Sequence, residues 1–465
     1  MLNPDRCFDP EPSQRRLARG LYATVERLGL ICPHGHVSPS VLHDNRPFGS
    51  PAELFVIPDH YVHRLLYSQG VPLEELGINQ TGGDGSNVDH RQVWRVFCRH
   101  FHLFRGTPTG LWLRDELESV FGISEKPSAD NADTLFDALE SQLAREEFLP
   151  RALFRRFQIS LLCTTDAATD SLEPHIALQS EGFAVRPTFR PDRLLELHSP
   201  DWRSELGQLE DLTSIPVTDY QGFIAALERR REQFKMAGAI ATDHGVTLPW
   251  TAPLLPAECE TILARALTGS ASAEDTDRFT AQMLLEFARM SCEDGLVMQL
   301  HAGSRRNHNT LLHGRFGANI GADIPVAVDW TRGLQALLDR YGNDSRLRLI
   351  LFTLDESTYS RELAPLAGHY PSLKLGPPWW FHDSVEGMLR FRRQTTETTG
   401  FYNTVGFNDD TRALLSIPAR HDLARRSECA YLAELVATHR LGEDEAAELI
   451  VDLSYSLAKK AYRLS

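Results

Sequence analysis

The sequence predicts an α/β protein that folds as a (β/α)8 TIM-type barrel with a helical insertion after the first strand. Eight short apolar runs, rich in leucine and β-branched residues, each end abruptly in polar residues. Continuous apolar runs without alternation are typical of strands buried on both faces, as in a parallel sheet. Amphipathic helical patterns separate most of the runs, for example over residues 275–295. Eight such units favour a barrel, and an open doubly wound sheet is the alternative.

The predicted strands carry their polar residues at their carboxyl ends. In chain order the runs are LGLICPHGHV from residue 28, ISLLCTTDAATD from 159, FAVRPTFRPD from 183, GAIATDHG from 238, LVMQLHAG from 296, LRLILFTLDE from 347, LKLGPPWW from 373 and NTVGFNDDTR from 403. In a barrel of this type the chemistry lies at the carboxyl ends of the strands. We therefore expect the polar ends to converge on one mouth: His34 and His36, Asp166, Arg190, Asp243 and His244, His301, Asp355 and Glu356, Trp379 and Trp380, and Asp409, Asp410 and Arg412.

A long segment separates the first two runs. It spans about 120 residues, too many for one crossover helix. Much of it has helical patterns, as in DHYVHRLLYSQGV, RQVWRVFCRHFHLFRG and ADTLFDALESQLA. We predict that residues 45–155 form a helical insertion over the barrel mouth, and that residues 1–44 and 156–465 form the barrel.

Composition and charge exclude several classes of partner. The chain has 465 residues and a formal net charge of −15, which argues against nucleic acid or an anionic membrane as a partner. No apolar run approaches the roughly 18 residues that would span a membrane. The seven cysteines are scattered without a C-x-x-C pair, and the N-terminus shows no apolar signal region. These features indicate reduced thiols in a cytoplasmic protein.

The first run ends in the pair His34 and His36. At this histidine content an H-x-H pair arises by chance about once per chain of this size, so the spacing alone decides little. At the end of a strand, however, residues i and i+2 project from the same face and can present two nitrogens to one ion. His100 and His102 have the same spacing but lie in a helical pattern, where i and i+2 point about 200° apart. We interpret that second pair as structural.

Further groups complete a metal hypothesis. An aspartate of the last run, with His301 as a further candidate, would complete a set of ligands that leaves positions open for water or substrate. A second metal would need a bridging group, often a carbamylated lysine of the fourth strand, and ATDHG contains no lysine. The sequence therefore predicts one metal ion.

Other polar residues of the predicted mouth indicate the kind of substrate. Arg190 and Arg412 beside a cation favour a substrate with a carboxylate, which guanidinium groups grip bidentately. His60 and Tyr61 begin the first inserted helix, either as core and cap or as acid–base groups over the metal. Trp379 and Trp380 are expected to wall the pocket.

The chain resembles the uronate isomerase (glucuronate isomerase) family of the amidohydrolase superfamily. The resemblance rests on HGHVSP, DHYVHRLLYSQGV, FHLFRGTPTGLWL, LLCTTDAATD, RPTFRPD, MQLHAGSRRNHNT, PPWWFHDSVEGM and TVGFNDDTRALLSIPARHD, in this order along nearly the whole chain. It implies a (β/α)8 barrel that interconverts D-glucuronate and D-fructuronate, or D-galacturonate and D-tagaturonate, with one divalent metal, usually zinc.

Positions carried over from the resemblance assign the site. They make His34, His36 and Asp410 metal ligands, and His301 a ligand or a neighbour of the ligands. They also match His60, Tyr61, Arg412 and Arg190 to family positions. We expect catalysis to involve His60, Tyr61, Asp410 and Arg412, and substrate binding to involve Arg190, Arg412, Trp380 and His301. The chain departs from the family where it has HGHV for H-C-H-L, RRNHN for R-N-N-N and DDTR for T-D-S-R. Asp409 is thereby a rival to Asp410, and His308 puts the preferred uronate in question.

The expected reaction moves a proton from C2 to C1 of the sugar acid, with Tyr61 (paired with His60) and Asp410 as alternative bases for the C2 proton. Arg412 would stabilise the oxyanion and Arg190 would hold the C6 carboxylate. Two other functions stay open: a metal-dependent hydrolase or decarboxylase, and a sugar-acid-binding scaffold without turnover. We expect a cytoplasmic homo-oligomer that binds a small-molecule uronate and neither nucleic acid nor membrane.

Overall fold

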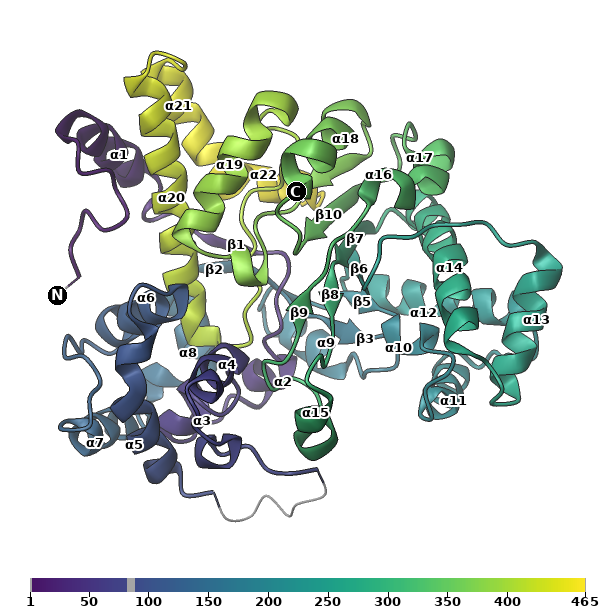
Figure 1. Cartoon of the computed structure of the whole chain (residues 1–465), viewed down its shortest axis with the longest axis horizontal. Coiled ribbons are helices and arrows are strands. Elements are labelled where there is room, and N and C mark those ends of the chain that lie inside the picture. The colour runs from purple at the N-terminus through teal and green to yellow at the C-terminus, as the bar shows by residue number, and fades with distance from the viewer. Residues whose placement is uncertain (1, 82–87, 465) are drawn as a thin grey trace.

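Parallel strands occupy the centre of the protein, and helices surround them (Figure 1). The computed structural model describes residues 2–81 and 88–464; residues 82–87 of the predicted insertion, together with residues 1 and 465, lie outside the described residues. The strands are β1 (Leu30–Cys32), β2 (Ile159–Cys163), β3 (Asp166–Ala167), β4 (Val185–Arg186), β5 (Phe189–Arg190), β6 (Ala241–Val246), β7 (Val297–Ala302), β8 (Ser304–Arg305), β9 (Ile324–Pro325), β10 (Leu349–Thr353) and β11 (Leu373–Leu375).

The strands form two parallel sheets that run into each other. One sheet has the order β1-β2-β4 and the other β11-β10-β7-β6-β5-β3, while β8 and β9 form a separate antiparallel pair. Thr164 N donates to Arg186 O at 3.0 Å and Asp166 N donates to Thr188 O at 3.1 Å, so hydrogen bonding continues from the β2–β4 pair to the β3–β5 pair. The second and third runs are thus each one interrupted strand. Pro187 lies at the interruption and has no N–H for the ladder.

The eighth run is not a continuous strand among the described residues. It makes one parallel bridge, between Leu375 and Thr404. Further along, Asp410 N donates to His34 O at 3.3 Å and His36 N donates to Thr411 O at 2.9 Å. The segment therefore lies between β11 and the residues that follow β1. Each of the other runs contains at least one strand, and the prediction of a parallel α/β protein is confirmed.

Burial of the strands on both faces explains why their sequences are apolar without alternation. In β10, Leu349 and Leu351 pack against the surrounding helices, while Ile350 and Phe352 pack with Val297 on the opposite face. All of these side chains are at most 2% exposed. In β7, Gln299 and His301 are buried as well. A strand in this position has no solvent face, so its pattern cannot alternate.

The segment between β1 and β2 is helical. Its helices are α2 (Pro39–Asp44), α3 (Pro51–Phe55), α4 (His60–Ser68), α5 (His90–His100), α6 (Pro108–Asp115), α7 (Ala132–Leu143) and α8 (Pro150–Arg156). Most of them gather at one side of the strands, in the blue and purple part of Figure 1. Their apolar faces share one buried cluster that includes Trp94, Phe97 and Phe104.

Most of the remaining helices lie along the outside of the strands (Figure 1). The remaining helices are α1 (Pro12–Val25), α9 (Glu173–Ser180), α10 (Asp192–Leu195), α11 (Trp202–Thr213), α12 (Tyr220–Met236), α13 (Pro256–Leu267), α14 (Ala273–Asp294), α15 (Thr310–Phe316), α16 (Trp330–Gly333), α17 (Gln335–Tyr341), α18 (Ala364–His369), α19 (Val385–Thr399), α20 (Ile417–Ala437), α21 (Glu443–Val451) and α22 (Leu457–Ala461). No helix in residues 2–81 and 88–464 is long and apolar enough to cross a membrane.

Candidate active site

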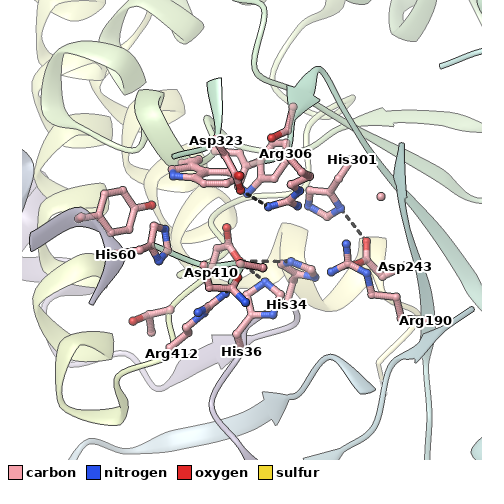
Figure 2. A pocket seen from close by; sticks show the side chains of 18 of the residues that line it. His34, His36, His60, Arg190, Asp243, His301, Arg306, Asp323, Asp410 and Arg412 are labelled. Carbon is pink, nitrogen blue, oxygen red and sulfur yellow. Dashed lines mark hydrogen bonds and ion pairs between the residues drawn. The ribbon is translucent and has the colours of Figure 1, made fainter. Parts of the chain in front are cut away.

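A cavity of about 1050 Å³ opens at the carboxyl ends of the strands. Every residue that the sequence predicts for the site lines it: His34, His36, His60, Tyr61, Arg190, His301, Trp379, Trp380, Asp410 and Arg412. Figure 2 shows the polar side chains pointing toward one another from β1, β5, β6, β7 and the 403–412 segment. The structure therefore brings together groups that are spread over almost the whole chain.

Four strand-end carboxylates do not reach this cavity, and the expectation that all polar ends converge is wrong for them. Asp166 accepts hydrogen bonds from Thr164 Oγ1 and Thr188 N within the sheet. Asp355 accepts from Val328 N, and Glu356 pairs with Arg390. Asp409 turns away from its neighbour Asp410 and lies against His421. Of these two consecutive aspartates, only Asp410 faces the mouth.

His34, His36 and Asp410 form a group of possible metal donors. One donor atom from each lies within 4.8 Å of the others. Asp410 Oδ1 is 3.0 Å from His36 Nε2 and 3.4 Å from His34 Nε2. The same oxygen is buried and, within residues 2–81 and 88–464, has no hydrogen-bond partner. Two nitrogens and an unsatisfied carboxylate oxygen that converge on one point fit a divalent cation in chemistry and in spacing.

The backbone at Asp410 is in an unusual conformation. Its φ of 42° lies in the left-handed region, which costs free energy for a residue other than glycine. The hydrogen bond from Asp410 N to His34 O holds this conformation, and Arg420 Nη1 donates to the adjacent Asp409 O at 3.2 Å. Trp380, which lines the same cavity, also has a positive φ of 54°. Such strain is typical of functional sites, where it fixes a side chain that unstrained backbone would aim elsewhere.

His301 is held by Asp243 on the neighbouring strand. Its Nδ1 donates to Asp243 Oδ1 at 2.6 Å, because an ionised carboxylate can only accept. Burial lowers the pKa of His301 to about 4, so the ring is neutral and its Nε2 carries a lone pair. Nε2 is buried and has no hydrogen-bond partner in the described part of the chain. His301 stacks on His34 with ring centroids 4.5 Å apart, and groups with His34 and Asp243 rather than with His36 and Asp410.

Arg190 reaches the cavity already paired with carboxylates. Its Nε donates to Asp192 Oδ2 at 2.7 Å, and its Nη1 lies 3.2 Å from Asp243 Oδ2. These partners raise the pKa of Arg190, against the cost of burial. Nη2 lies against Gly245, where a Cβ would come within 2.4 Å of it. Only the absence of a side chain at Gly245 gives the guanidinium its place.

His60 and Tyr61 enter the cavity from the first turn of α4. Asp59 caps this helix by accepting from Tyr61 N and Val62 N. The two rings stack with centroids 4.6 Å apart, and His60 meets the Trp380 ring edge-on at 5.5 Å. Burial lowers the pKa of His60 to about 3 and raises that of Tyr61. The imidazole is therefore neutral and the phenol keeps its proton.

The other arginines of the cavity differ in how they are paired. Arg306 donates to Asp323 at 2.9 Å, and Arg420 donates to Asp383 at 2.7 Å while its guanidinium covers the Trp112 ring. Arg412 donates to Asn319 Oδ1 at 3.0 Å and, within the described parts of the chain, has no ion pair with a carboxylate. Arg412 is thus the cavity guanidinium with the most available charge.

Sequence reasoning missed several residues of this cavity. They are Asp192, Arg306, Asn319, Asp323, Arg420 and, as a partner of His301, Asp243. The RPD triplet did contain a signal for Asp192, since an aspartate two residues after an arginine can reach its guanidinium. The sequence gives no comparable signal for Arg420, because α20 is buried on nearly all sides and shows no amphipathic pattern.

The pair His100 and His102 does not line the cavity. α5 ends at His100, so the pair straddles the end of the helix, with ring centroids 6.4 Å apart. His100 Nδ1 is 2.8 Å from Val96 O and His102 Nδ1 is 3.2 Å from Arg99 O. Each ring is satisfied by its own preceding turn, in agreement with a structural role.

The parallel strands and the cluster of possible metal donors at their carboxyl ends define an α/β protein with an enzyme-like site at one end of its sheet. Residues 13–462 match the glucuronate isomerase family. The chain belongs to that family, and the resemblance seen in its motifs is confirmed.

Sequence relatives support the same family over the whole chain. The uronate isomerase of Nostoc punctiforme is 54% identical over 466 residues, covering 100% of this chain and 98% of that protein. The uronate isomerase of Rhizorhabdus wittichii is 55% identical over 465 residues, with the same coverage of 100% and 98%.

Solved structures agree. The crystal structure of glucuronate isomerase from Caulobacter crescentus has a TM-score of 0.97 at 50% identity, covering 100% of this chain and 97% of that one. The uronate isomerase structure from Thermotoga maritima has a TM-score of 0.92 at 27% identity, and the match covers 99% of both chains. A putative metal-dependent hydrolase from Lactobacillus casei gives 0.53 at 16% identity over 95% and 97%, a likeness of fold alone.

Proposed function

We propose that this enzyme isomerises hexuronates between aldose and ketose, D-glucuronate to D-fructuronate or D-galacturonate to D-tagaturonate. The observation that carries the proposal is the convergence of His34, His36 and Asp410 in the cavity that also holds Arg412. A cluster for a cation beside an available guanidinium suits a substrate with vicinal oxygens and a carboxylate. The named activities of the family's members support the same reaction.

One divalent metal ion, which we propose to be zinc, would be held by His34, His36 and Asp410, with His301 either as a further ligand or beside them. When bound, the ion supplies Lewis acidity at the sugar's carbonyl oxygen. His301 is oriented for either role by Asp243, which fixes the proton on Nδ1.

The proton transfers fall to the chain's own side chains. The C2–H bond breaks and a C1–H bond forms, while the hydroxyl proton of O2 moves to O1, so no atom is gained or lost. Tyr61 keeps its phenolic proton because burial raises its pKa, which suits it to donate a hydrogen bond to a sugar oxygen. We therefore propose Asp410 as the acceptor of the C2 proton and Tyr61, packed against neutral His60, as the donor at the sugar oxygens.

Two arginines would bind the ends of the substrate. Arg412, two residues from Asp410, is proposed to stabilise the oxyanion that develops as the C2 proton leaves. Arg190 is proposed to hold the C6 carboxylate through Nη2, the terminal nitrogen without a carboxylate partner in the described residues. Trp380, whose ring contacts His60 and Arg306, would form one wall of the substrate pocket.

We also propose that the strands close into a (β/α)8 barrel and that residues 45–155 cover its mouth. The hydrogen bonds that join 403–405 to β11 and 410–411 to the end of β1 support closure. Cavity-lining residues from α3, α4 and α6, such as Phe55 and Trp112, support the covering role of the insertion. A cytoplasmic homo-oligomer is a further proposal, consistent with seven unpaired cysteines, and light scattering would measure its mass.

The test is an assay of product. The protein, purified with Zn²⁺ or Mn²⁺, is incubated with D-glucuronate or D-galacturonate, and ketose formation and mass are followed. We expect a ketose of unchanged mass from at least one of them. A change of mass would instead favour a hydrolase or decarboxylase, and uronate binding without turnover or metal requirement would favour a scaffold. No ketose from either substrate would refute the proposed function.

A further inference from the structure

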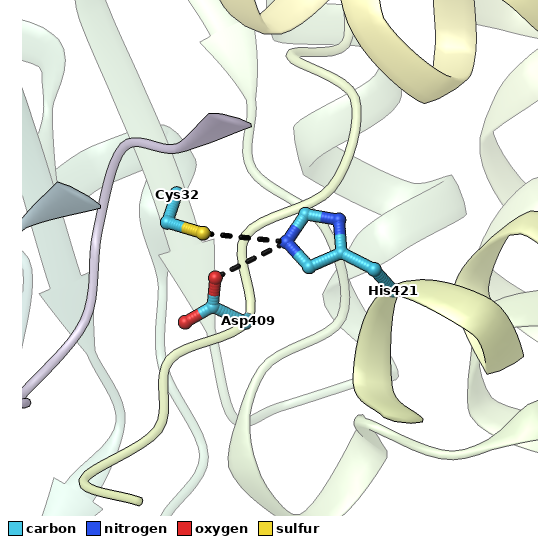
Figure 3. Close-up of side chains that lie close together, drawn as sticks. All are labelled: Cys32, Asp409 and His421. Atoms are coloured by element: carbon cyan, nitrogen blue, oxygen red, sulfur yellow. Dashed lines mark hydrogen bonds and ion pairs between the residues drawn. The ribbon is translucent and has the colours of Figure 1, made fainter. Parts of the chain in front are cut away.

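Another group of possible metal donors, Cys32, Asp409 and His421, lies outside the set of residues that line the cavity (Figure 3). Cys32 ends β1, two residues before His34; Asp409 precedes Asp410; and His421 projects from the first half of α20. None of these three is more than 3% exposed, and none lines the cavity. His421 Nε2 is 3.6 Å from Cys32 Sγ and 3.2 Å from Asp409 Oδ2.

Both short contacts involve the same nitrogen. An imidazole Nε2 carries either one hydrogen or one lone pair, so it can make one good hydrogen bond at a time. If it donates to Asp409, the Cys32 thiol can donate to the same carboxylate; if it accepts from the thiol, the carboxylate loses the imidazole as a donor. Asp409 Oδ1 is buried and has no hydrogen-bond partner among the described residues. Hydrogen bonding within the group thus leaves this carboxylate oxygen unsatisfied.

The charge of Asp409 is also poorly compensated. The carboxylate is fully buried, and its only ion-pair partner within the described chain is His421. Arg420 reaches the main-chain oxygen of Asp409 rather than its side chain. Gly35 lies close to the unpartnered oxygen, since a Cβ at this position would be 3.3 Å from Asp409 Oδ1. A buried carboxylate beside a thiol and an imidazole is stabilised best by a cation that all three can share.

The spacing of the donors agrees with tetrahedral coordination. Bonds of about 2.3 Å to sulfur and about 2.0 Å to nitrogen or oxygen place sulfur and nitrogen about 3.5 Å apart, and nitrogen and oxygen about 3.3 Å apart. The observed separations are 3.6 and 3.2 Å. We propose that Cys32, Asp409 and His421 form a second metal site, which takes a thiophilic divalent cation of the zinc class. Binding releases the thiol proton to solvent and ties β1 to the segment that carries Asp410.

The thiolate distinguishes this site from the cavity, whose donors are nitrogen and oxygen. Cobalt(II) bound to a thiolate has an intense near-ultraviolet charge-transfer absorption, which cobalt on histidine and carboxylate lacks. Because the site is buried, cobalt is supplied during expression, and the purified full-length enzyme is examined by absorption and by metal analysis. We expect about two metal ions per chain and a thiolate-to-cobalt band.

Three variants test whether the thiolate-to-cobalt band comes from Cys32. Cys32→Ser is expected to lose the band and about one metal ion, whereas Cys163→Ser, a buried thiol on neighbouring β2, keeps both. His36→Asn is expected to lose the cavity metal and keep the band, so failure of the cavity assignment is separable from failure of this one. Wild-type enzyme with no thiolate band overturns the proposal without any variant. A band that survives Cys32→Ser overturns it equally.

Discussion

His301 and Asp243 lie on adjacent parallel strands and are joined by a hydrogen bond of 2.6 Å between Nδ1 and Oδ1. The bond assigns the proton of the ring to Nδ1 and leaves the Nε2 lone pair to the cavity. Asp243 also forms an ion pair with Arg190, with 3.2 Å between Oδ2 and Nη1. One carboxylate therefore positions both a histidine and an arginine of the site. Such supporting carboxylates commonly contribute one to two orders of magnitude to activity.

Replacing Asp243 by asparagine should therefore impair turnover. We expect Asp243→Asn to lower kcat/KM by about 10- to 100-fold. The neutral amide would form a weaker interaction with the Arg190 guanidinium and would stabilise the Nδ1–H tautomer of His301 less than the carboxylate does. Metal analysis of the same variant decides the role of His301: retained metal indicates a substrate contact, and lost metal indicates a ligand. Asp355→Asn, at a strand end outside the cavity, is the control and should leave kcat/KM unchanged. Wild-type activity in Asp243→Asn would contradict the positioning role.

Metal binding at the first H-x-H pair can be tested against the second. His36 is suited to substitution because its side chain is 29% exposed, unlike His34 at 2%. We expect His36→Asn to lose the cavity metal and at least about 100-fold in kcat, since a three-donor site loses one donor. His102→Asn removes the same type of residue from the same spacing and should change neither. Chelation should abolish wild-type activity, and added Zn²⁺ or Mn²⁺ should restore it. If both variants keep metal and activity, the assignment of ligands is wrong.

The sequence allowed the members of the site to be predicted better than their contacts. His34 and His36 could be found because their spacing is local and their position at a strand end is readable from the apolar run. The partnership of His301 with Asp243 could not, because it joins residues 58 apart through a register in which Gly245 pairs with His301. The direction of Asp409 was equally hidden, since it depends on the left-handed backbone at Asp410. Strand interruptions at Pro187 and the loose eighth segment likewise depend on long-range hydrogen bonds.

Gly245 should control how Arg190 meets the substrate. An added Cβ would lie 2.4 Å from Arg190 Nη2 and 2.9 Å from Asp192 Oδ2, so the guanidinium must move. If Arg190 holds the C6 carboxylate, Gly245→Ala should raise KM about 10-fold with a smaller change in kcat. Steady-state kinetics with the preferred uronate measure both.

The control for Gly245→Ala is another glycine-to-alanine change with no steric consequence. Gly207 lies in α11, and a Cβ there would meet nothing within 4 Å. Gly207→Ala should leave KM unchanged and stabilise the protein by about 0.5–1 kcal/mol, because alanine favours the helix. An unchanged KM in Gly245→Ala would show that Arg190 does not contact the substrate.

Asp166 should make stability depend on pH. Burial raises its pKa from 3.8 to about 7, while hydrogen bonds from Thr164 and Thr188 N oppose the shift. Neighbouring His175 stays neutral, because burial lowers its pKa to about 4. The folded protein therefore binds a proton at Asp166 that the unfolded chain releases above pH 4. The contribution of this proton to the free energy of unfolding is fully present below pH 4 and is lost as pH rises through about 7.

An asparagine at this position cannot ionise and can still accept one or both hydrogen bonds through its amide oxygen. We expect Asp166→Asn to gain about 2–3 kcal/mol relative to wild type between pH 5 and pH 8, seen as a difference in Tm that grows with pH. Comparing the two proteins at each pH cancels the opposite dependence of His175, which loses stability as pH falls from 6.5 toward 4. Asp201 is exposed, so the Tm of Asp201→Asn should follow that of wild type at every pH. Parallel curves for Asp166→Asn as well would mean that the buried carboxyl is already ionised at pH 5, stabilised by its hydrogen bonds more than burial opposes it.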